Sequence, residues 1–184
     1  MSEKTVFEPI FKRVTEKNEE ICVKKIWQDV FGDDEDFVDK FYSIFPMEKN
    51  TFVAKYGDNV VGIVNAIDCK ISYENELFYG KYIYALAVDK NYRGRGLARA
   101  LLEISESGSF MLLVPETPEL FAMYGKLGYK QKVNVDERFV DPCLFFEGGG
   151  SDKRVSALVK IIDVKMNDKL DHFEEEKAKF FIQG

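Results

Sequence analysis

The residues with the most evident chemistry lie between an apolar strand pattern and an amphipathic helix pattern. Arg93-Gly94-Arg95-Gly96 follows the apolar run Ile83–Val88 and precedes a helical stripe formed by Leu97, Leu101 and Ile104. Glycine permits positive φ and a close approach of the backbone to a ligand. The first N–H groups of a helix lack internal partners and lie at the positive end of its dipole. The spacing therefore predicts a turn that binds a phosphate group.

Two other interpretations compete for these four residues. The dinucleotide fingerprint G-x-G-x-x-G is rejected because Arg99 occupies its third glycine position and the motif lies in the middle of the chain. An ordinary solvated connection with two glycines stays open when the turn is considered alone.

Two blocks of sequence resemble the GNAT superfamily of N-acetyltransferases. V-D-K-N-Y-R-G-R-G-L-A-R-A-L-L is similar to its coenzyme A motif, Gln/Arg-x-x-Gly-x-Gly/Ala, which Arg93, Gly96 and Ala98 match. L-F-A-M-Y-G-K-L-G-Y, residues 120–129, is similar to the helix and turn that end in Phe-Tyr-x-Lys-x-Gly-Phe/Tyr. The resemblance covers roughly residues 20–132. I-Y-A-L-A-V, V-P-E and Y-G-K-L-G-Y look most like the enhanced-intracellular-survival type and its short bacterial relatives.

This resemblance implies direct attack of a neutral amine on the thioester of acetyl-CoA, the cosubstrate, with no covalent enzyme intermediate and no metal. Tyr124 stands at the family's acid position and would protonate the departing thiolate. The resemblance also implies a coenzyme site of three parts. Backbone groups of one strand would pair with pantetheine, N–H groups of the turn would bind the pyrophosphate, and arginines would add hydrogen bonds. The strand residues are Leu86, Ala87 and Val88. The residues of the turn are Gly94, Arg95, Gly96, Leu97 and Ala98. The arginines are Arg93, Arg95 and Arg99, and Arg93 is the first candidate for a hydrogen bond to the pyrophosphate.

The general base stays open. Many superfamily members carry a glutamate on the fourth strand, and Tyr84 occupies the comparable position here. Relatives of the survival type use the terminal carboxylate, which would be Gly184 in this sequence, and the single histidine, His172, is expected to be solvated. The remaining candidates by placement are Asp68, Glu74, Glu76 and Glu116. Because Tyr84 replaces the usual base, a noncatalytic acyl-CoA-binding regulatory module is the alternative function.

The pattern of elements predicts an α/β fold with a mixed, mostly antiparallel central sheet flanked by helices. Two helices, from Asn18 to Phe31 and from an Asp33-Asp34 cap to Phe45, precede a hairpin and a further antiparallel strand. A helix over residues 94–105 then requires a parallel neighbour. The strands are Thr51–Tyr56, Val60–Ser72, Leu77–Val88 and the parallel Phe110–Val114. This arrangement resembles the GNAT, or acyl-CoA N-acyltransferase, fold that the two motif blocks imply.

The sequence patterns at the two ends of the chain are less specific for one structure. Residues 1–132 are expected to form the acetyltransferase core, and residues 133–184 a C-terminal strand and helix extension of the same domain. Residues 1–16 fit either a strand or a loose arm. In the extension, Val155–Val164 reads as a strand and Asp171–Ile182 as a helix, with a flexible break at Gly148–Ser151. An alternative is that the extension mediates assembly into a homo-oligomer through a sheet edge.

Composition limits the partners. The chain of 184 residues has a net charge of -6, which does not favour nucleic-acid binding and suits attraction of cationic amines. The acceptor is expected to be an amine of a small molecule or peptide. Three separated cysteines, Cys22, Cys69 and Cys143, indicate neither a disulfide framework nor a zinc site. No apolar stretch has the length of a signal peptide or a membrane span, so we expect a cytoplasmic protein with no membrane partner.

Overall fold

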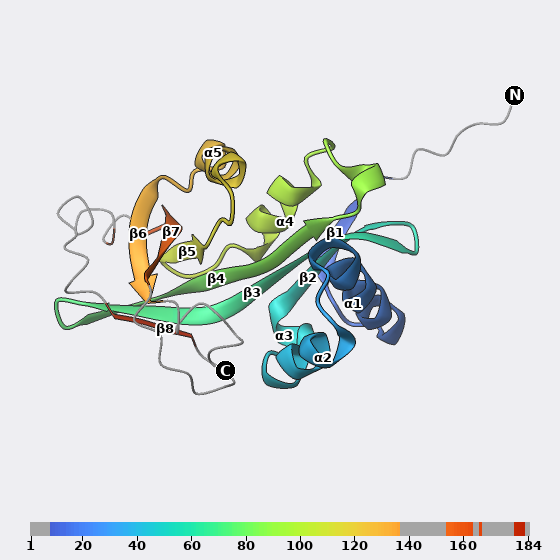
Figure 1. Cartoon of the computed structure of the whole chain (residues 1–184), viewed down its shortest axis with the longest axis horizontal. Coiled ribbons are helices and arrows are strands. Elements are labelled where there is room, and N and C mark those ends of the chain that lie inside the picture. Colours follow the sequence, from blue (N-terminus) through green and yellow to red (C-terminus); the bar gives the residue numbers. More distant parts are fainter. Residues whose placement is uncertain (1–7, 137–153, 164–165, 167–178, 183–184) are drawn as a thin grey trace, which may run out of the picture. The chain divides into compact units, whose positions relative to one another are not determined.

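The computed structural model describes residues 8–136, 154–163, 166 and 179–182 (Figure 1). In this part of the chain the strands are hydrogen-bonded in the order β1-β2-β3-β4-β5-β7-β6, and β8 pairs with β3. β4 and β5 are parallel, as predicted, and the other registers described are antiparallel. The predicted mixed, mostly antiparallel sheet with flanking helices is confirmed. The elements are β1 (Ile10–Arg13), α1 (Lys17–Phe31), α2 (Glu35–Ile44), α3 (Met47–Asn50), β2 (Thr51–Tyr56), β3 (Asn59–Tyr73), β4 (Glu76–Val88), the 3-10 helix η1 (Lys90–Tyr92), α4 (Leu97–Ser105), β5 (Phe110–Leu113), α5 (Pro118–Lys126), β6 (Gln131–Asp136), β7 (Arg154–Ile161) and β8 (Lys179–Ile182).

The chain divides into two compact units. The first contains residues 1–66 and 85–105, and the second contains residues 67–84 and 106–184. Both units take residues from β3 and β4, because each of these long strands passes from one unit into the other. The division of the sequence at residue 132 into a core and an extension stays a prediction.

The first unit begins with two helices whose ends follow the predicted signals. Gly32 ends α1 in the left-handed conformation, with φ 79°, and its N–H donates to the carbonyl oxygen of Gln28. Asp34 caps α2 by accepting a hydrogen bond from the backbone N–H of Phe37 at 2.7 Å. Trp27 is fully buried and packs edge-on against Phe41 at a ring-centroid distance of 4.8 Å. The α1–α2 pair is therefore held together by an aromatic core.

Alternate residues of β3 in the first unit face opposite sides. A Cβ atom on Gly62 would lie 3.1 Å from Leu101 of α4, whereas Asn65 accepts a hydrogen bond from Tyr42 of α2. Since successive side chains of a strand point to opposite faces, α4 covers one face and α2 the other, as Figure 1 shows. The absence of a side chain at Gly62 allows α4 to lie close to β3.

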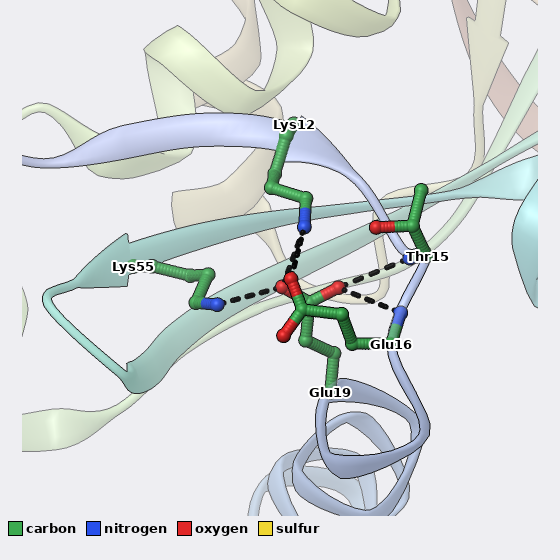
Figure 2. Close-up of polar contacts among 5 residues, drawn as sticks. All are labelled: Lys12, Thr15, Glu16, Glu19 and Lys55. Atoms are coloured by element: carbon green, nitrogen blue, oxygen red, sulfur yellow. Dashed lines mark hydrogen bonds and ion pairs between the residues drawn. The ribbon is translucent and has the colours of Figure 1, made fainter.

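The N-terminus of α1 is held to β1 and β2 by a buried carboxylate (Figure 2). Glu19 is only 2% exposed and accepts hydrogen bonds from Lys12 Nζ at 2.8 Å and Lys55 Nζ at 2.7 Å. Its second oxygen accepts from the backbone N–H groups of Thr15 at 3.0 Å and Glu16 at 3.3 Å. Burial raises the pKa of Glu19, but the hydrogen bonds from the two lysines and from Thr15 outweigh it and lower the pKa to about 2.

The second unit is built around the parallel pair of β4 and β5. Gly80 on β4 lies opposite Phe110, where a Cβ atom would come within 2.3 Å of the Phe110 carbonyl oxygen. β7 pairs antiparallel with β5 and with β6, so two strands beyond residue 130 extend this part of the sheet. An ion pair joins Lys160 of β7 to Glu106, which follows α4 in the sequence.

Several predictions about individual segments need correction. The helix predicted over 94–105 begins only at Leu97, because Gly94 and Gly96 both have positive φ and cannot continue a right-handed helix. Ile104 is 38% exposed and lies outside the buried stripe of Leu97, Leu101 and Leu102. The undecided N-terminal segment contains β1, paired with β2.

The C-terminal helix prediction is wrong at its end. Lys179–Ile182 forms β8, which pairs with Cys69–Ser72 of β3. The sequence K-F-F-I favours a strand because aromatic and β-branched residues fit a pleated surface. The predicted break at Gly148–Ser151 and residues 171–178 of the predicted helix lie outside the described residues, as do residues 1–7 and 137–146.

The Glu19 cluster generates a stability prediction. Replacing Glu19 with glutamine leaves the buried lysine Lys55 without its carboxylate, so we expect the free energy of unfolding in urea to fall by about 3 kcal/mol at neutral pH. Glu20→Gln, which breaks the exposed pair with Lys17, is the matched control and should change it by less than about 1 kcal/mol.

The same variant has a defined pH dependence. The folded-state pKa of Glu19 lies below its ordinary value, so its stabilisation is present above pH 4.5 and is lost as the pH falls from 4.5 toward 2. The difference in the free energy of unfolding between the wild type and Glu19→Gln should therefore become smaller as the pH falls over this interval. A difference that stays constant would contradict the ionised form as the source of the stabilisation.

Candidate active site

In the first unit, β4 is followed by the Arg93–Gly96 turn, which the sequence predicts to bind a phosphate group. The Asp89 N–H donates to the Val61 carbonyl oxygen at 2.9 Å, and the Asp89 side chain accepts from the Asn91 N–H at 2.7 Å. Gly94 and Gly96 then take φ values of 76° and 79°, and a Cβ atom on either would meet no atom within 4 Å. The glycines are therefore required by the backbone conformation and not by crowding, and the space beside them is open to a ligand.

The turn opens directly into α4. The Ala100 N–H donates to the Gly96 carbonyl oxygen at 3.1 Å, and Leu97 and Leu101 are buried. Anchored in this way, the helix begins with first-turn N–H groups that have no partner inside the helix. Leu97, Ala98 and Arg99 provide these groups, and they lie at the positive end of the helix dipole. The arrangement can bind an anion.

The three arginines around the turn differ in what they contact. Arg93 Nε donates to the Val88 carbonyl oxygen at 3.0 Å, which uses one of its five N–H donors and ties the turn to the end of β4. Arg95 donates to the Asn91 carbonyl oxygen at 3.2 Å and lies over the Tyr92 ring at 5.0 Å. Arg99 is exposed on α4. Arg95 thus braces the turn itself, whereas Arg93 retains terminal amino groups for an anion.

The backbone of β4 is irregular just before the turn. Ala85 has φ 52°, in the left-handed region that residues with a Cβ atom rarely adopt. The register with β5 runs only from Gly80–Phe110 to Ile83–Leu113, while β4 continues to Val88. Beyond Ile83 the strand therefore has backbone groups for which β5, as described, provides no partner. Ala87 and Val88 are buried here and Leu86 is half-buried.

Sequence reasoning missed this irregularity. It placed Leu86, Ala87 and Val88 at the coenzyme, but Ala85 carries no glycine or asparagine signal for positive φ. A strained residue of this kind persists only where its surroundings hold it, and such residues gather at functional sites. The one available sign was indirect: the small residues Ala85 and Ala87 lie in a strand that otherwise carries several large side chains, among them three tyrosines.

Tyr124 lies in the second unit, near the end of α5. Thr117 caps this helix by accepting from the Leu120 N–H, and Pro118 occupies its first position. Tyr124 is 8% exposed, and its ring meets the Tyr129 ring edge-on. Burial, and after it the charge of Glu116, raises the pKa of Tyr124 to about 12. The phenol is therefore protonated at neutral pH and can donate a proton.

The residues that the sequence offered as candidates for the general base lie in different parts of the structure. Asp68 forms an ion pair with the buried Lys81 at 2.7 Å. Glu74 and Glu76 lie at the β3–β4 turn, where both are exposed, and Glu116 is exposed but close enough to Tyr124 to affect its pKa. Tyr84, at the position of the family's glutamate, is half-buried beside Tyr82, with the ring centroids 6.0 Å apart. His172 and Gly184 lie outside the described residues.

The described residues were also compared with the requirements of a metal site and of a membrane-spanning helix. Within the described residues, no group of three or more histidine, cysteine, aspartate or glutamate side chains could hold a metal ion. None of the described helices is long and apolar enough to cross a membrane.

Comparison with known proteins agrees with this geometry. A family model described as an acetyltransferase (GNAT) domain matches residues 11–131. No curated protein sequence matches the chain. A chain of a NatC complex, bound to Gag peptide and CoA, is 17% identical, with a TM-score of 0.59 over 85% of this chain and 99% of that one. Naa50 from Arabidopsis thaliana, in complex with the bisubstrate analogue CoA-Ac-MVNAL, is 20% identical, with a TM-score of 0.56 over 84% and 99%.

The predicted likeness to the survival type has a structural counterpart. Eis1 from Mycobacterium abscessus is 9% identical, with a TM-score of 0.51 over 71% of this chain and 34% of that one. At such identities these structures show the shared fold. The family model covers more than half of the chain, from β1 to the start of β6. The chain therefore belongs to the GNAT acetyltransferase family.

Proposed function

We propose that the protein transfers the acetyl group of acetyl-CoA to a primary amine of a small molecule or peptide by direct attack on the thioester. The observation that carries this proposal is the sequence of features at the end of β4. An irregular strand without a β5 partner leads into a positive-φ glycine turn and the open N-terminus of α4. Such a surface offers hydrogen bonds along an extended ligand that ends in a phosphate group.

In this proposal the coenzyme is bound mainly by the backbone. Peptide groups of Leu86, Ala87 and Val88 would pair with the pantetheine amides, which fixes the thioester along β4 and lowers the entropic barrier to attack. The N–H groups from Gly94 to Ala98 would bind the pyrophosphate. Arg93, already oriented by Val88, would add a charge-assisted hydrogen bond.

The chemical step needs two proton movements. The amine nitrogen forms a bond to the thioester carbonyl carbon, and the carbon–sulfur bond breaks as the thiolate leaves. Tyr124 would give its phenolic proton to that sulfur, and its raised pKa keeps the proton on the phenol until then. The amine gives up a proton to water or to a carboxylate, for which Glu116 is the exposed acid that already affects Tyr124.

Two observations support an amine of a small molecule or peptide as the acceptor. The net charge of -6 favours cationic amines over anionic acceptors. The NatC and Naa50 structures contain, respectively, a Gag peptide and a bisubstrate analogue in which CoA-Ac is joined to MVNAL. A panel of peptide N-terminal amines, alongside small polyamines, is therefore the first set of acceptors to test.

Binding of the coenzyme tests the turn. Isothermal titration should give micromolar affinity for acetyl-CoA and no binding of NADH, and Gly96→Glu should weaken acetyl-CoA binding at least 10-fold, because a carboxylate would enter the anion site. Gly32→Glu is the matched control, since Gly32 also has φ 79° and open space but ends α1. Equal affinity in the wild type and Gly96→Glu would refute the proposed pyrophosphate site.

Turnover tests Tyr124. Tyr124→Phe keeps the ring and loses the proton, so kcat should fall about 100-fold while the Kd for acetyl-CoA stays unchanged. Because the pKa of Tyr124 is about 12, we expect no loss of wild-type kcat from its ionisation up to about pH 10. Tyr79→Phe, at an exposed tyrosine of β4, serves as the control. An unchanged kcat in Tyr124→Phe would remove Tyr124 from the mechanism.

A further inference from the structure

Three planar side chains of the first unit lie one against the next beside the candidate coenzyme turn. The Tyr56 ring, at the end of β2, stacks on the Tyr92 ring of η1, with the ring centroids 5.4 Å apart and an interplanar angle of 29°. The Arg95 guanidinium lies over the Tyr92 ring at 5.0 Å. This Tyr56–Tyr92–Arg95 stack therefore joins the β2–β3 hairpin to the turn.

The turn has little in its own sequence that would hold its shape. Residues 93–96 are exposed, and Gly94 and Gly96, with φ 76° and 79°, have open space beside them. Glycine loses more conformational entropy than any other residue when its backbone is fixed. If the N–H groups of the turn had to be ordered as an anion binds, that ordering would weaken binding. Contacts that order the turn beforehand therefore raise its affinity for an anion.

Arg95 is the side chain through which the turn reaches back to η1. Its guanidinium donates to the Asn91 carbonyl oxygen at 3.2 Å and lies over the Tyr92 ring, and both partners belong to η1 (Lys90–Tyr92). The position of Arg95 thus depends on where η1 lies. Tyr56 contacts η1 through the Tyr92 ring, so the hairpin helps to fix the element from which Arg95 is held.

The stack borders an open hollow of about 850 Å³, which is lined by residues of the β2–β3 hairpin and by Tyr92 and Arg95. Both tyrosines of the stack are half-buried. Because there is space beside the rings, burial alone does not confine the Tyr92 ring, and the Tyr56 ring restrains it from the hairpin side. Stacked aromatic pairs contribute stability beyond the area that they bury.

We propose that Tyr56 is a positioning residue for the coenzyme: its ring fixes Tyr92 and, through Tyr92 and Arg95, the turn that binds the pyrophosphate. This inference rests on the proposed function. In this role Tyr56 orders the turn before the coenzyme arrives and does not touch the coenzyme. The ring is required and the hydroxyl is not. The effect falls on coenzyme affinity and not on the chemical step, because the turn does not contact the reacting atoms.

Tyr56→Ala in the full chain tests this inference. Isothermal titration should show that the Kd for acetyl-CoA rises about 5-fold, as expected for the loss of one stacked pair, and the KM for acetyl-CoA should rise with it while kcat at saturation stays unchanged. Tyr56→Phe keeps the ring and should retain the wild-type Kd. Tyr79→Ala, at an exposed tyrosine of β4 in the second unit, is the matched control and should leave the Kd unchanged.

A double variant tests whether Tyr56 acts through Tyr92. Tyr92→Ala removes both ring contacts of the stack, so Tyr56→Ala/Tyr92→Ala should bind acetyl-CoA no more weakly than Tyr92→Ala alone. Should Tyr56→Ala fail to fold, Tyr56→Leu takes its place, because leucine keeps an apolar side chain but offers no planar ring, and the same rise in Kd is expected.

The outcomes separate this inference from the proposed function. Wild-type affinity in Tyr56→Ala, or an equal loss in Tyr56→Phe or Tyr79→Ala, would overturn the role of the Tyr56 ring and leave the proposed function intact. Losses that multiply in the double variant would overturn it as well, since Tyr56 would then act independently of Tyr92. A wild-type protein that does not bind acetyl-CoA would overturn the proposed function and this inference with it.

Discussion

The left-handed φ of Ala85 is the constraint on which the candidate coenzyme site depends. A regular strand would keep its peptide groups in the ladder up to its end and would leave none for a ligand. Here β4 departs from extended geometry at Ala85, and the register with β5 has ended two residues earlier, at Ile83. A non-glycine residue in this conformation costs of order 1–2 kcal/mol. The sheet bears this strain at the place where the strand approaches the turn.

Packing in the first unit provides the support that this strain requires. The Asp89–Val61 hydrogen bond fixes β4 to β3 beyond the irregularity, and Gly62 lets α4 approach the same strands from one side. On the other side, the Glu19 carboxylate joins the start of α1 to Lys12 of β1 and Lys55 of β2. Ordered on both faces, the strands can hold one residue in an unfavourable conformation without local unfolding.

Much of this arrangement could be predicted from the sequence, because local signals and long-range packing agree in most elements. The Gly32 stop, the Asp34 cap and the break between the strands predicted over Thr51–Tyr56 and Val60–Ser72 each coincide with a change in periodicity, and the structure has element boundaries at these points. The prediction failed where tertiary pairing decides the outcome. K-F-F-I at 179–182 has a composition that fits a strand, but it continues the helical pattern that begins at Asp171, and pairing with β3 determines that it is a strand.

The same distinction explains what could be predicted of the site. Gly94 and Gly96 could be predicted from the sequence because only glycine adopts φ near 80° at little cost, so this backbone conformation requires a recognisable residue type. The Ala85 irregularity left only the indirect sign of two alanines in the strand, because alanine itself shows no preference for positive φ. A site formed largely by peptide groups also places few demands on side chains outside its glycines. The proposed coenzyme site is of this kind, and it is compatible with a fold shared with the NatC and Naa50 structures at only 17% and 20% identity.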